Sequence, residues 1–428
     1  MYEAYITTLK NVRKHSNADK LQVGECFGNQ VIIDLSYKEG DIGIYFPTDG
    51  KIGQEFAEAN NLLRKKDENG NNIGGYLDPD KRNIKAIKLR GEKSDGLFMP
   101  LYSLTPFCNI NELKVGDRIT TLNGNLICEK YIPRTNKRKV NNNGNKQIKK
   151  KKEIEFPLFA EHIDTPQFQY NLDMFHNGDE IIITEKLHGT SARIGYMIKE
   201  KANSGLIGKM LNKYLKPKYE YVSGSRRVVL NSFDGGFYGD NKFREQWHDF
   251  FKGKLQKGEE IFGEIVGFIS PNLPIMPDGN NEKIGDKEFI KKYGKKTQFS
   301  YGCNREKGTN DFYIYRMTKT DEDGNVFEYP YDYMKVRAEQ MGAKVVPLLD
   351  KFYFTNIEDL QEKVKKHVKG SSTIDISHIR EGVVIRINNY NKCNFTKEKQ
   401  FEFKVIEGII KDEAKEPDIE ELQEIEGE

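Results

Sequence analysis

A basic, polar segment divides this chain of 428 residues into two parts. Residues Lys130–Lys152 carry ten basic side chains and no acidic one, with several Asn and Gly and few apolar residues. A segment of this composition cannot bury enough apolar surface to form a core, so we predict a linker over residues 129–153. The alternative to a simple linker is that the basic side chains contact phosphates or serve as a targeting signal. The linker separates a module at residues 1–128 from a larger unit at residues 154–411.

The composition fits a folded chain with a polar surface. Hydrophobic residues make up 37% and charged residues 31%, and the net charge of +3 does not by itself predict a nucleic-acid partner. No apolar run approaches the roughly 20 residues of a membrane helix, and the N-terminus lacks the pattern of a secretion signal. The five scattered cysteines indicate neither a zinc site nor a disulfide framework. We expect a monomer that is intracellular and cytoplasmic, with a nuclear signal left open by the basic linker.

Short β-type runs dominate both parts of the chain. Residues 1–128 alternate such runs with Gly, Asp and Asn turns, which predicts a small barrel or sandwich, and Gln54–Lys66 predicts one helix among them. The larger unit has strand-like runs that read EIIIT, EYVSGS, EIFGEIVGF, DFYIYRM, GVVIRI and QFEFKVI. Asn241–Gly253 and Tyr331–Ala343 predict helices between them, so we expect an α+β unit of mainly antiparallel sheets. The tail at residues 412–428, with nine acids and one lysine, predicts a frayed helix or disorder.

The stretch ITEKLHGTSAR, residues 183–193, ends a strand-like run with a lysine. Lysine is normally protonated, and it becomes a nucleophile when burial or nearby cations lower its pKa. Lys186 lies three residues before Gly189, which permits a tight turn and a close approach of the backbone to a ligand. Taken alone, such a lysine is more often an ordinary charge at a strand end.

Charged residues in later apolar runs change this interpretation. Glu264 and Lys404 lie within apolar runs, Glu381 lies just before Gly382 and the apolar run after it, and an arginine pair follows the run EYVSGS. A carboxylate in an apolar strand is costly unless it is paired or ligated. Each charge has an ordinary interpretation as one half of an ion pair, but the set together with Lys186 indicates one functional site.

At this point the sequence resembles a known family. The ordered series EKLHGT, SGSRR, FGEIVGF, DFYIYRM, REGVVIR and FKVI resembles the six motifs of the covalent nucleotidyltransferases, which are the ATP-dependent ligases and the mRNA capping enzymes. EKLHGTS is most similar to RNA ligases that seal nicks, because DNA ligases have Asp at the position of His. GDIGIYFPTDG, IKLRGEKSDGLFMPL and HSNADKLQ resemble the OB-like leading module of RNA ligases of the Deinococcus and Naegleria type. The resemblance implies an α+β protein, with an N-terminal OB-like β-barrel followed by an ATP-grasp-like nucleotidyltransferase domain.

The resemblance also implies roles for the matching residues. Lys186 would attack the α-phosphate of ATP and hold AMP as a phosphoramidate, and Glu381 would bind a catalytic Mg²⁺ or Mn²⁺. The implied nucleotide contacts are Glu185 facing adenine, His188 and Gly189 at the turn, Arg226 (or Arg227) on ribose or phosphate, Glu264 on the ribose hydroxyls, Tyr315 stacked on adenine and Lys404 on the α-phosphate.

Two positions depart from the family pattern. Arg316 follows Tyr315 where family members often have Asp. The last motif is often Lys-x-Lys, whereas here it reads Lys404-Val405-Ile406. Lys399 and Lys411 are candidates for the missing lysine.

The sequence thus predicts an ATP-dependent RNA ligase acting on RNA with 5′-phosphate and 3′-hydroxyl ends, at nicks in a duplex. The N-terminal module would bind RNA through basic side chains, with an ordinary charged surface as the alternative; they are Arg82, Lys85, Lys88, Arg90 and Lys93. A GTP-dependent capping enzyme or a DNA ligase would be expected to carry its OB domain after the ligase domain. An RNA-binding protein with a degenerate ligase domain is the non-enzyme alternative.

Overall fold

The computed structural model describes residues 2–70, 72–132, 156–199, 217–230, 232–233, 241–390 and 394–413, without the side chains of Asn72 and residues 409–413. Most of the predicted linker and nearly all of the acidic tail lie outside these residues. The chain forms two compact units. Unit 1 comprises Met1–Thr135, Gly279–Lys296 and Phe401–Pro417, and unit 2 comprises Asn136–Asp278, Thr297–Gln400 and Asp418–Glu428.

The two units do not follow the predicted boundaries throughout. We expected residues 154–411 to form one continuous unit. In the structure, residues 279–296 and 401–417 belong to unit 1 instead. The run QFEFKVI, residues 400–406, was predicted to be a strand, and this prediction is wrong, because Phe401–Glu413 forms helix α7. Phe403 and Ile406, three residues apart on one helix face, are buried.

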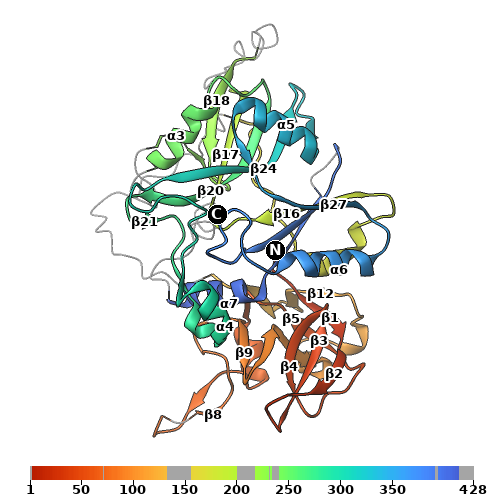
Figure 1. Ribbon diagram of the computed structural model, residues 1–428. Helices are drawn as coiled ribbons and strands as arrows, with labels where there is room; N and C mark the ends of the chain where they lie inside the picture. Colours follow the sequence, from red (N-terminus) through yellow and green to blue (C-terminus); the bar gives the residue numbers. More distant parts are fainter. Residues whose placement is uncertain are drawn as a thin grey trace, which may run out of the picture. The chain divides into compact units, whose positions relative to one another are not determined.

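Unit 1 is built from short antiparallel strands (Figure 1). One sheet has the strand order β11-β5-β1-β12 and another has the order β2-β3-β4, with hairpins β9–β10, β7–β8 and β13–β14 and the pair β6–β15. The strands are β1 (Ala4–Thr8), β2 (Lys10–Lys14), β3 (Leu21–Cys26), β4 (Asn29–Asp34), β5 (Ile42–Phe46), β6 (Gly50–Ile52), β7 (Lys65–Lys66), β8 (Asn72–Gly74), β9 (Ala86–Leu89), β10 (Glu92–Asp95), β11 (Leu97–Pro100), β12 (Arg118–Ile119), β13 (Thr121–Leu122), β14 (Asn125–Leu126) and β15 (Cys128–Lys130). The small β-rich module is observed, and its closure into an OB barrel stays a prediction.

The first helix of unit 1 is short. The helix predicted over Gln54–Lys66 ends early, since α1 covers only Gln54–Ala59. Asn61 adopts a positive φ of 51°, which Asn tolerates better than most residues, and this turns the chain out of the helix. The carbonyl of Leu62 then accepts the backbone N–H groups of Tyr76 and Leu77, so the segment forms an isolated β-bridge with the chain around Leu77 instead. The segment at residues 279–296 adds β22 (Gly279–Asn280) and α4 (Lys287–Tyr293).

Unit 2 contains two mainly antiparallel sheets, with β26 parallel to β24 in the larger one. The smaller has the order β27-β16-β28-β29, and the larger has the order β19-β18-β17-β20-β24-β25, with β21 on β20 and β26 on β24. Their strands are β16 (Glu180–Lys186), β17 (Thr190–Ile198), β18 (Tyr219–Gly224), β19 (Val229–Leu230), β20 (Glu259–Ser270), β21 (Leu273–Pro274), β24 (Asn310–Thr320), β25 (Val326–Glu328), β26 (Lys344–Val345), β27 (Leu348–Tyr353), β28 (Gly382–Ile387) and β29 (Phe395–Lys399). β23 (Lys296–Thr297) lies at the boundary of the units and pairs with β22.

Each sheet of unit 2 packs against helices (Figure 1). Helices α3 (Lys242–Phe251) and α5 (Tyr331–Met341), both predicted, cover the larger sheet and bury Phe251 and Met334 in its core. Helix α6 (Ile357–Val368) covers the smaller sheet. The predicted α+β architecture of mainly antiparallel sheets is confirmed. Among the described residues, no helix combines the length and the apolar character needed to cross a membrane.

Candidate active site

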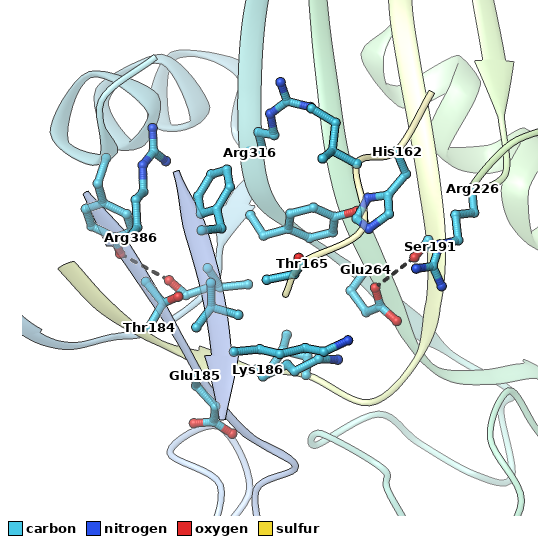
Figure 2. A pocket seen from close by; sticks show the side chains of 18 residues that line it. His162, Thr165, Thr184, Glu185, Lys186, Ser191, Arg226, Glu264, Arg316 and Arg386 are labelled. Carbon is cyan, nitrogen blue, oxygen red and sulfur yellow. Dashed lines mark hydrogen bonds between the residues drawn. The ribbon is translucent and has the colours of Figure 1, made fainter. Parts of the chain in front are cut away.

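A pocket in unit 2 is lined by strands of both sheets (Figure 2). Strands β16, β28 and β29 contribute from the smaller sheet, and β17, β20 and β24 from the larger one. The segment before β16 adds a further wall. The residues that the argument uses are His162, Lys186, Ser191, Arg226, Glu264, Tyr315, Arg316, Arg386 and Lys397.

Lys186 is the last residue of β16 and lies at the pocket wall. Its cross-strand partner is Gly382 on β28, which brings the neighbouring residue Glu381 beside it. The Nζ atom of Lys186 lies 2.8 Å from Oε1 of Glu381, whose side chain is only 3% exposed. The pairing of β16 with β28 therefore unites a lysine and a buried carboxylate that lie far apart in the sequence.

The turn after Lys186 is buried. The ring of His188 packs edge-on against Phe299, with 4.8 Å between centroids, and its Nδ1 atom lies 3.8 Å from Oε2 of Glu381. A Cβ atom at Gly189 would lie 2.2 Å from the carbonyl oxygen of Ile265 on β20. The glycine was expected to allow a ligand to approach, but in the structure it allows the close approach of β20. Neither His188 nor Gly189 lines the pocket.

A β-bulge directs two consecutive side chains of β24 into the pocket. The register between β20 and β24 shifts so that Phe262 pairs with Arg316 and Gly263 with Ile314, which leaves Tyr315 as the extra residue. Bulges are frequent at active sites because they redirect a side chain. The hydroxyl of Tyr315 lies 3.1 Å from Nδ1 of His162.

Arg316, where family members often have Asp, forms a buried ion pair. Its guanidinium donates to both carboxylate oxygens of Glu328 on β25, at 3.0 to 3.1 Å, and covers the ring of Phe262. Arg386 on β28 lies 3.9 Å from the same carboxylate. The substitution of Asp by Arg is therefore matched by a partner of opposite charge.

Glu264 on β20 lies opposite Ser191 on β17, and its carboxylate accepts a hydrogen bond from the serine hydroxyl at 3.5 Å. The serine carries no signal in the sequence by itself. Its position follows only from the register of the two strands.

The positions of Arg226 and Arg227 in the structure differ. Arg226 lines the pocket, its side chain is 11% exposed, and it forms an ion pair with Asp164. Arg227 does not line the pocket, and its side chain is 36% exposed. The backbone carbonyl of Arg226 also accepts the N–H of His162 at 3.0 Å, which ties the segment before β16 to the pocket wall.

Glu185 is turned away from the other labelled side chains in Figure 2. Its Oε2 atom accepts hydrogen bonds from the backbone N–H and the hydroxyl of Thr373, at 2.8 and 2.5 Å. Alternation along β16 explains this orientation, because neighbouring residues of a strand point to opposite faces.

The lysine pair of the last motif has a counterpart on β29. Lys397 lines the pocket, and Nζ of Lys399 lies 3.2 Å from Oε1 of Glu381. Desolvation and the nearby cations Lys399 and Lys186 lower the pKa of Lys397 to about 7. The sequence does contain this signal, since Lys397-Glu398-Lys399 is a Lys-x-Lys. Lys399 was named only as a candidate, and Lys397 was missed.

Lys404 belongs to the other unit of the chain. It lies on α7 in unit 1, where its Nζ atom forms an ion pair with Asp95 of β10 at 2.8 Å. Both side chains are close to 10% exposed, at 12% and 11%. The contacts of Lys404 within unit 1 are those of a structural ion pair.

The pocket has donors that suit a nucleotide with a divalent cation. Among the described residues, no group of three or more His, Cys, Asp or Glu side chains could hold a metal on its own. Mg²⁺ commonly binds one or two carboxylates and completes its shell with water and substrate phosphates. Glu381 beside Lys186 fits that donor set.

The fold and the lysine-centred pocket are those of a ligase-type nucleotidyltransferase. The chain belongs to the RNA ligase family, whose model matches residues 179–406. No curated protein matches the chain.

Solved structures of a Naegleria gruberi RNA ligase share the fold. A variant with ATP and manganese is 18% identical with a TM-score of 0.56, and the match covers 96% of this chain and 99% of that one. A variant with AMP and manganese is 19% identical with a TM-score of 0.57, covering 94% and 97%. The complex with pyrophosphate is 17% identical with a TM-score of 0.56, covering 96% and 98%.

Proposed function

We propose that this protein is an ATP-dependent RNA ligase that acts through a covalent lysyl-AMP and seals nicks in duplex RNA. The observation that carries the proposal is the environment of Lys186, which lies at a pocket wall 2.8 Å from a buried carboxylate. Family membership supports RNA as the substrate. The Naegleria gruberi structures with ATP or AMP support an adenine nucleotide as the co-substrate. The monomeric state and the cytoplasmic location stay predictions.

The proposed reaction has three steps. First, the Lys186 amine loses a proton and attacks the α-phosphorus of ATP; a P–N bond forms, and pyrophosphate leaves with the electron pair of the broken P–O bond. Second, an oxygen of the RNA 5′-phosphate attacks the same phosphorus, and the lysine leaves and regains a proton. Third, the RNA 3′-hydroxyl loses a proton and attacks the 5′-phosphate, so that a phosphodiester forms and AMP leaves.

The pocket residues, together with Lys399 beside Glu381, would divide this work by their chemistry. The ring of Tyr315 offers a face for the base, and Glu264 can accept hydrogen bonds from the ribose hydroxyls. Arg226, Lys397 and Lys399 can neutralise the phosphates as negative charge moves to the leaving group. Lys399 replaces Lys404 in the role that was predicted for the last motif.

A divalent cation would be held by Glu381 together with substrate phosphates and water. When bound, it would supply positive charge beside the α-phosphate and favour the unprotonated form of the neighbouring amine. In the protein alone, Glu381 lies between Lys186 and Lys399 and keeps both side chains in place.

RNA would bind to a cationic surface of unit 1. Of the predicted basic residues, Arg82 donates to the carbonyl of Ile52, and Lys93 pairs with Glu402 of α7, so both have contacts within the unit. Arg90 is exposed at the β9–β10 turn. Lys88 lies 3.8 Å from Asp286, which precedes α4. Helix α4 and the strand after it add exposed lysines beside this hairpin, and they are Lys287, Lys291, Lys292, Lys295 and Lys296.

Covalent labelling tests the proposal. The protein is incubated with ATP or GTP labelled at the α-phosphate, with Mg²⁺ or Mn²⁺, and acid-stable label on the protein is measured. We expect labelling by ATP that is lost in Lys186→Ala. The variant should still seal a nick that carries a 5′-adenylate, because this step does not use the lysine as a nucleophile.

Labelling by GTP alone would instead indicate a capping enzyme, and no label with either nucleotide would overturn both enzyme assignments. Nicked duplexes with RNA or DNA on each side then define the substrate. We expect a requirement for RNA at the 3′-hydroxyl side, and equal sealing of an all-DNA nick would contradict it.

A further inference from the structure

Two segments outside the pocket lining contact the residues near Lys186, one through the backbone of His188 and the other through the side chain of Glu185. On its C-terminal side, the hydroxyl of Tyr301 accepts a hydrogen bond from the backbone N–H of His188 at 2.7 Å. On its N-terminal side, Thr373 donates two hydrogen bonds to Glu185, the residue that precedes the lysine. The lysine is thus fixed through its neighbours in the chain.

Tyr301 adopts a conformation that its side chain disfavours. Its φ is +49°, and that of Gly302 is +77°, so both central residues of the turn Ser300–Cys303 have positive φ, as in a type I′ turn. Glycine, Asn and Asp are usual at such positions. A residue with a bulky side chain keeps this conformation only where its surroundings impose it, and such strain is concentrated at functional sites.

The loop Ser371–Ile379 supplies those surroundings. Oδ2 of Asp375 accepts hydrogen bonds from the Ser300 hydroxyl and the Gly302 N–H, at 2.5 and 3.1 Å. Nε2 of His378 accepts the backbone N–H of Tyr301 at 3.4 Å, and the two rings pack edge-on at 4.6 Å. Tyr301 is 1% exposed and His378 is fully buried. Burial lowers the pKa of His378, which favours the neutral imidazole that this acceptor role needs.

One loop therefore contacts the residues on both sides of Lys186, either directly or through the Tyr301 turn. It contacts Glu185 directly through Thr373, and it contacts His188 through the strained Tyr301 turn. A tyrosine hydroxyl and a single loop would not be needed at this place for core packing alone, because a phenylalanine ring fills nearly the same volume.

We propose that Tyr301 is a positioning residue for attack by Lys186, and that the loop Ser371–Ile379 is its support. The inference rests on the proposed role of Lys186 as the nucleophile. In-line attack depends on the placement of the reacting atom, and a displacement of about 1 Å can cost a factor of about 100 in rate. Without the phenol oxygen, the His188 amide loses its acceptor and the turn after Lys186 is free to shift.

The test compares Tyr301→Phe with Tyr221→Phe. The hydroxyl of Tyr221 also accepts a backbone N–H, that of Gly253 at 2.8 Å, and donates to the carbonyl of Leu255, so its hydrogen bonds do not hold the residues beside Lys186. For each protein, lysine adenylylation is measured in single turnover over a range of ATP concentrations. Sealing of a nick that already carries a 5′-adenylate is measured without ATP, and this reaction does not require attack by the lysine.

We expect Tyr301→Phe to slow the maximal rate of adenylylation about tenfold or more, with half-saturation by ATP changed less than about twofold. Sealing of the adenylated nick should stay within about twofold, and Tyr221→Phe should match the parent in both assays. Thr373→Val removes the hydroxyl donor on the other flank at a surface position, and it should slow adenylylation in the same selective way.

An adenylylation rate of Tyr301→Phe equal to that of the parent overturns the inference. So does an equal loss in both reactions, which a general structural defect would give. If the parent protein forms no covalent adenylate, the proposed function fails as well, whereas normal labelling of the parent with an unaffected Tyr301→Phe refutes the positioning role alone.

Discussion

Lys397 is a cation of the pocket whose charge should depend on whether a nucleotide is bound. Its side chain is half-buried, and desolvation with the nearby charges of Lys399, Lys186 and Arg226 lowers its pKa from 10.5 to about 7. In the protein without nucleotide, the Lys397 amine therefore changes between its charged and neutral forms near neutral pH. Phosphates of a bound nucleotide favour the charged amine, so binding above pH 7 should include the uptake of a proton.

This coupling predicts how nucleotide affinity depends on pH. Affinity for an ATP analogue that cannot transfer its α-phosphate should weaken as the pH rises from 7 to 9, with a slope that approaches about tenfold per pH unit. Lys397→Met should bind more weakly at pH 7 and show a flatter profile. Calorimetric titration of both proteins in several buffers measures the slope and the proton uptake. Parallel profiles for the parent and Lys397→Met would refute the assignment.

The stability of the unliganded protein should depend on pH in the direction opposite to that of nucleotide affinity. Between pH 7 and 10.5 the unfolded chain binds more protons at Lys397 than the folded chain, because the folded pKa is the lower one. The contribution of this residue to the free energy of unfolding therefore rises with pH across that window. Urea unfolding at several pH values, compared with Lys397→Met, isolates this contribution.

At the scale of elements, strand β29 and helix α7 separate lysines that the sequence had assigned to one motif. Lys399 on β29 reaches Glu381 at 3.2 Å, whereas Lys404 on α7 pairs with Asp95 in unit 1. The run QFEFKVI has apolar residues at alternate positions, which fits a strand, and also three residues apart, which fits a helix. Short apolar runs do not distinguish the two periods.

Substitution of the two lysines should therefore have different effects. Lys399→Ala should slow adenylylation about 100-fold, because a cation beside the α-phosphate and a partner of Glu381 are both removed. Lys404→Ala should keep the rate within about threefold and lower the free energy of unfolding by about 1–3 kcal/mol, since Asp95 remains buried without this partner. Single-turnover kinetics and urea unfolding provide the two measurements. A loss of adenylylation in Lys404→Ala as large as in Lys399→Ala would return the motif role to Lys404.

Across the whole molecule, the sequence predicted what local pattern encodes. The strands that carry Lys186 and Glu264, and the strand that begins just after Glu381, were recognised from their apolar residues, and the α+β class followed from the number of short runs. The bulge at Tyr315 and the partner of Arg316 depend on the register between strands, which no local pattern specifies. The transfer of residues 279–296 to unit 1 depends on contacts between distant segments, so the predicted boundaries did not include it.

Those residues also support the last prediction, which concerns how unit 1 binds RNA. The segment at residues 279–296 has six lysines and three acids, and five of the lysines lie exposed between Lys287 and Lys296. Exposed lysines bind phosphates and release counterions, so their contribution to affinity decreases as salt increases. Adenylylation should not depend on them, because the nucleotide pocket lies in unit 2.

The double variant Lys291→Glu with Lys292→Glu should therefore weaken binding of a nicked RNA duplex about tenfold or more at about 0.1 M salt and reduce the salt slope by about 1 to 2. Its adenylylation rate should equal that of the parent. Lys10→Glu with Lys14→Glu provides the matched control, since these lysines are exposed on β2 of the same unit and the change in net charge is identical. Equal weakening by both double variants would mean that total charge, and not the surface formed by α4 and the β9–β10 hairpin, determines how this protein holds RNA.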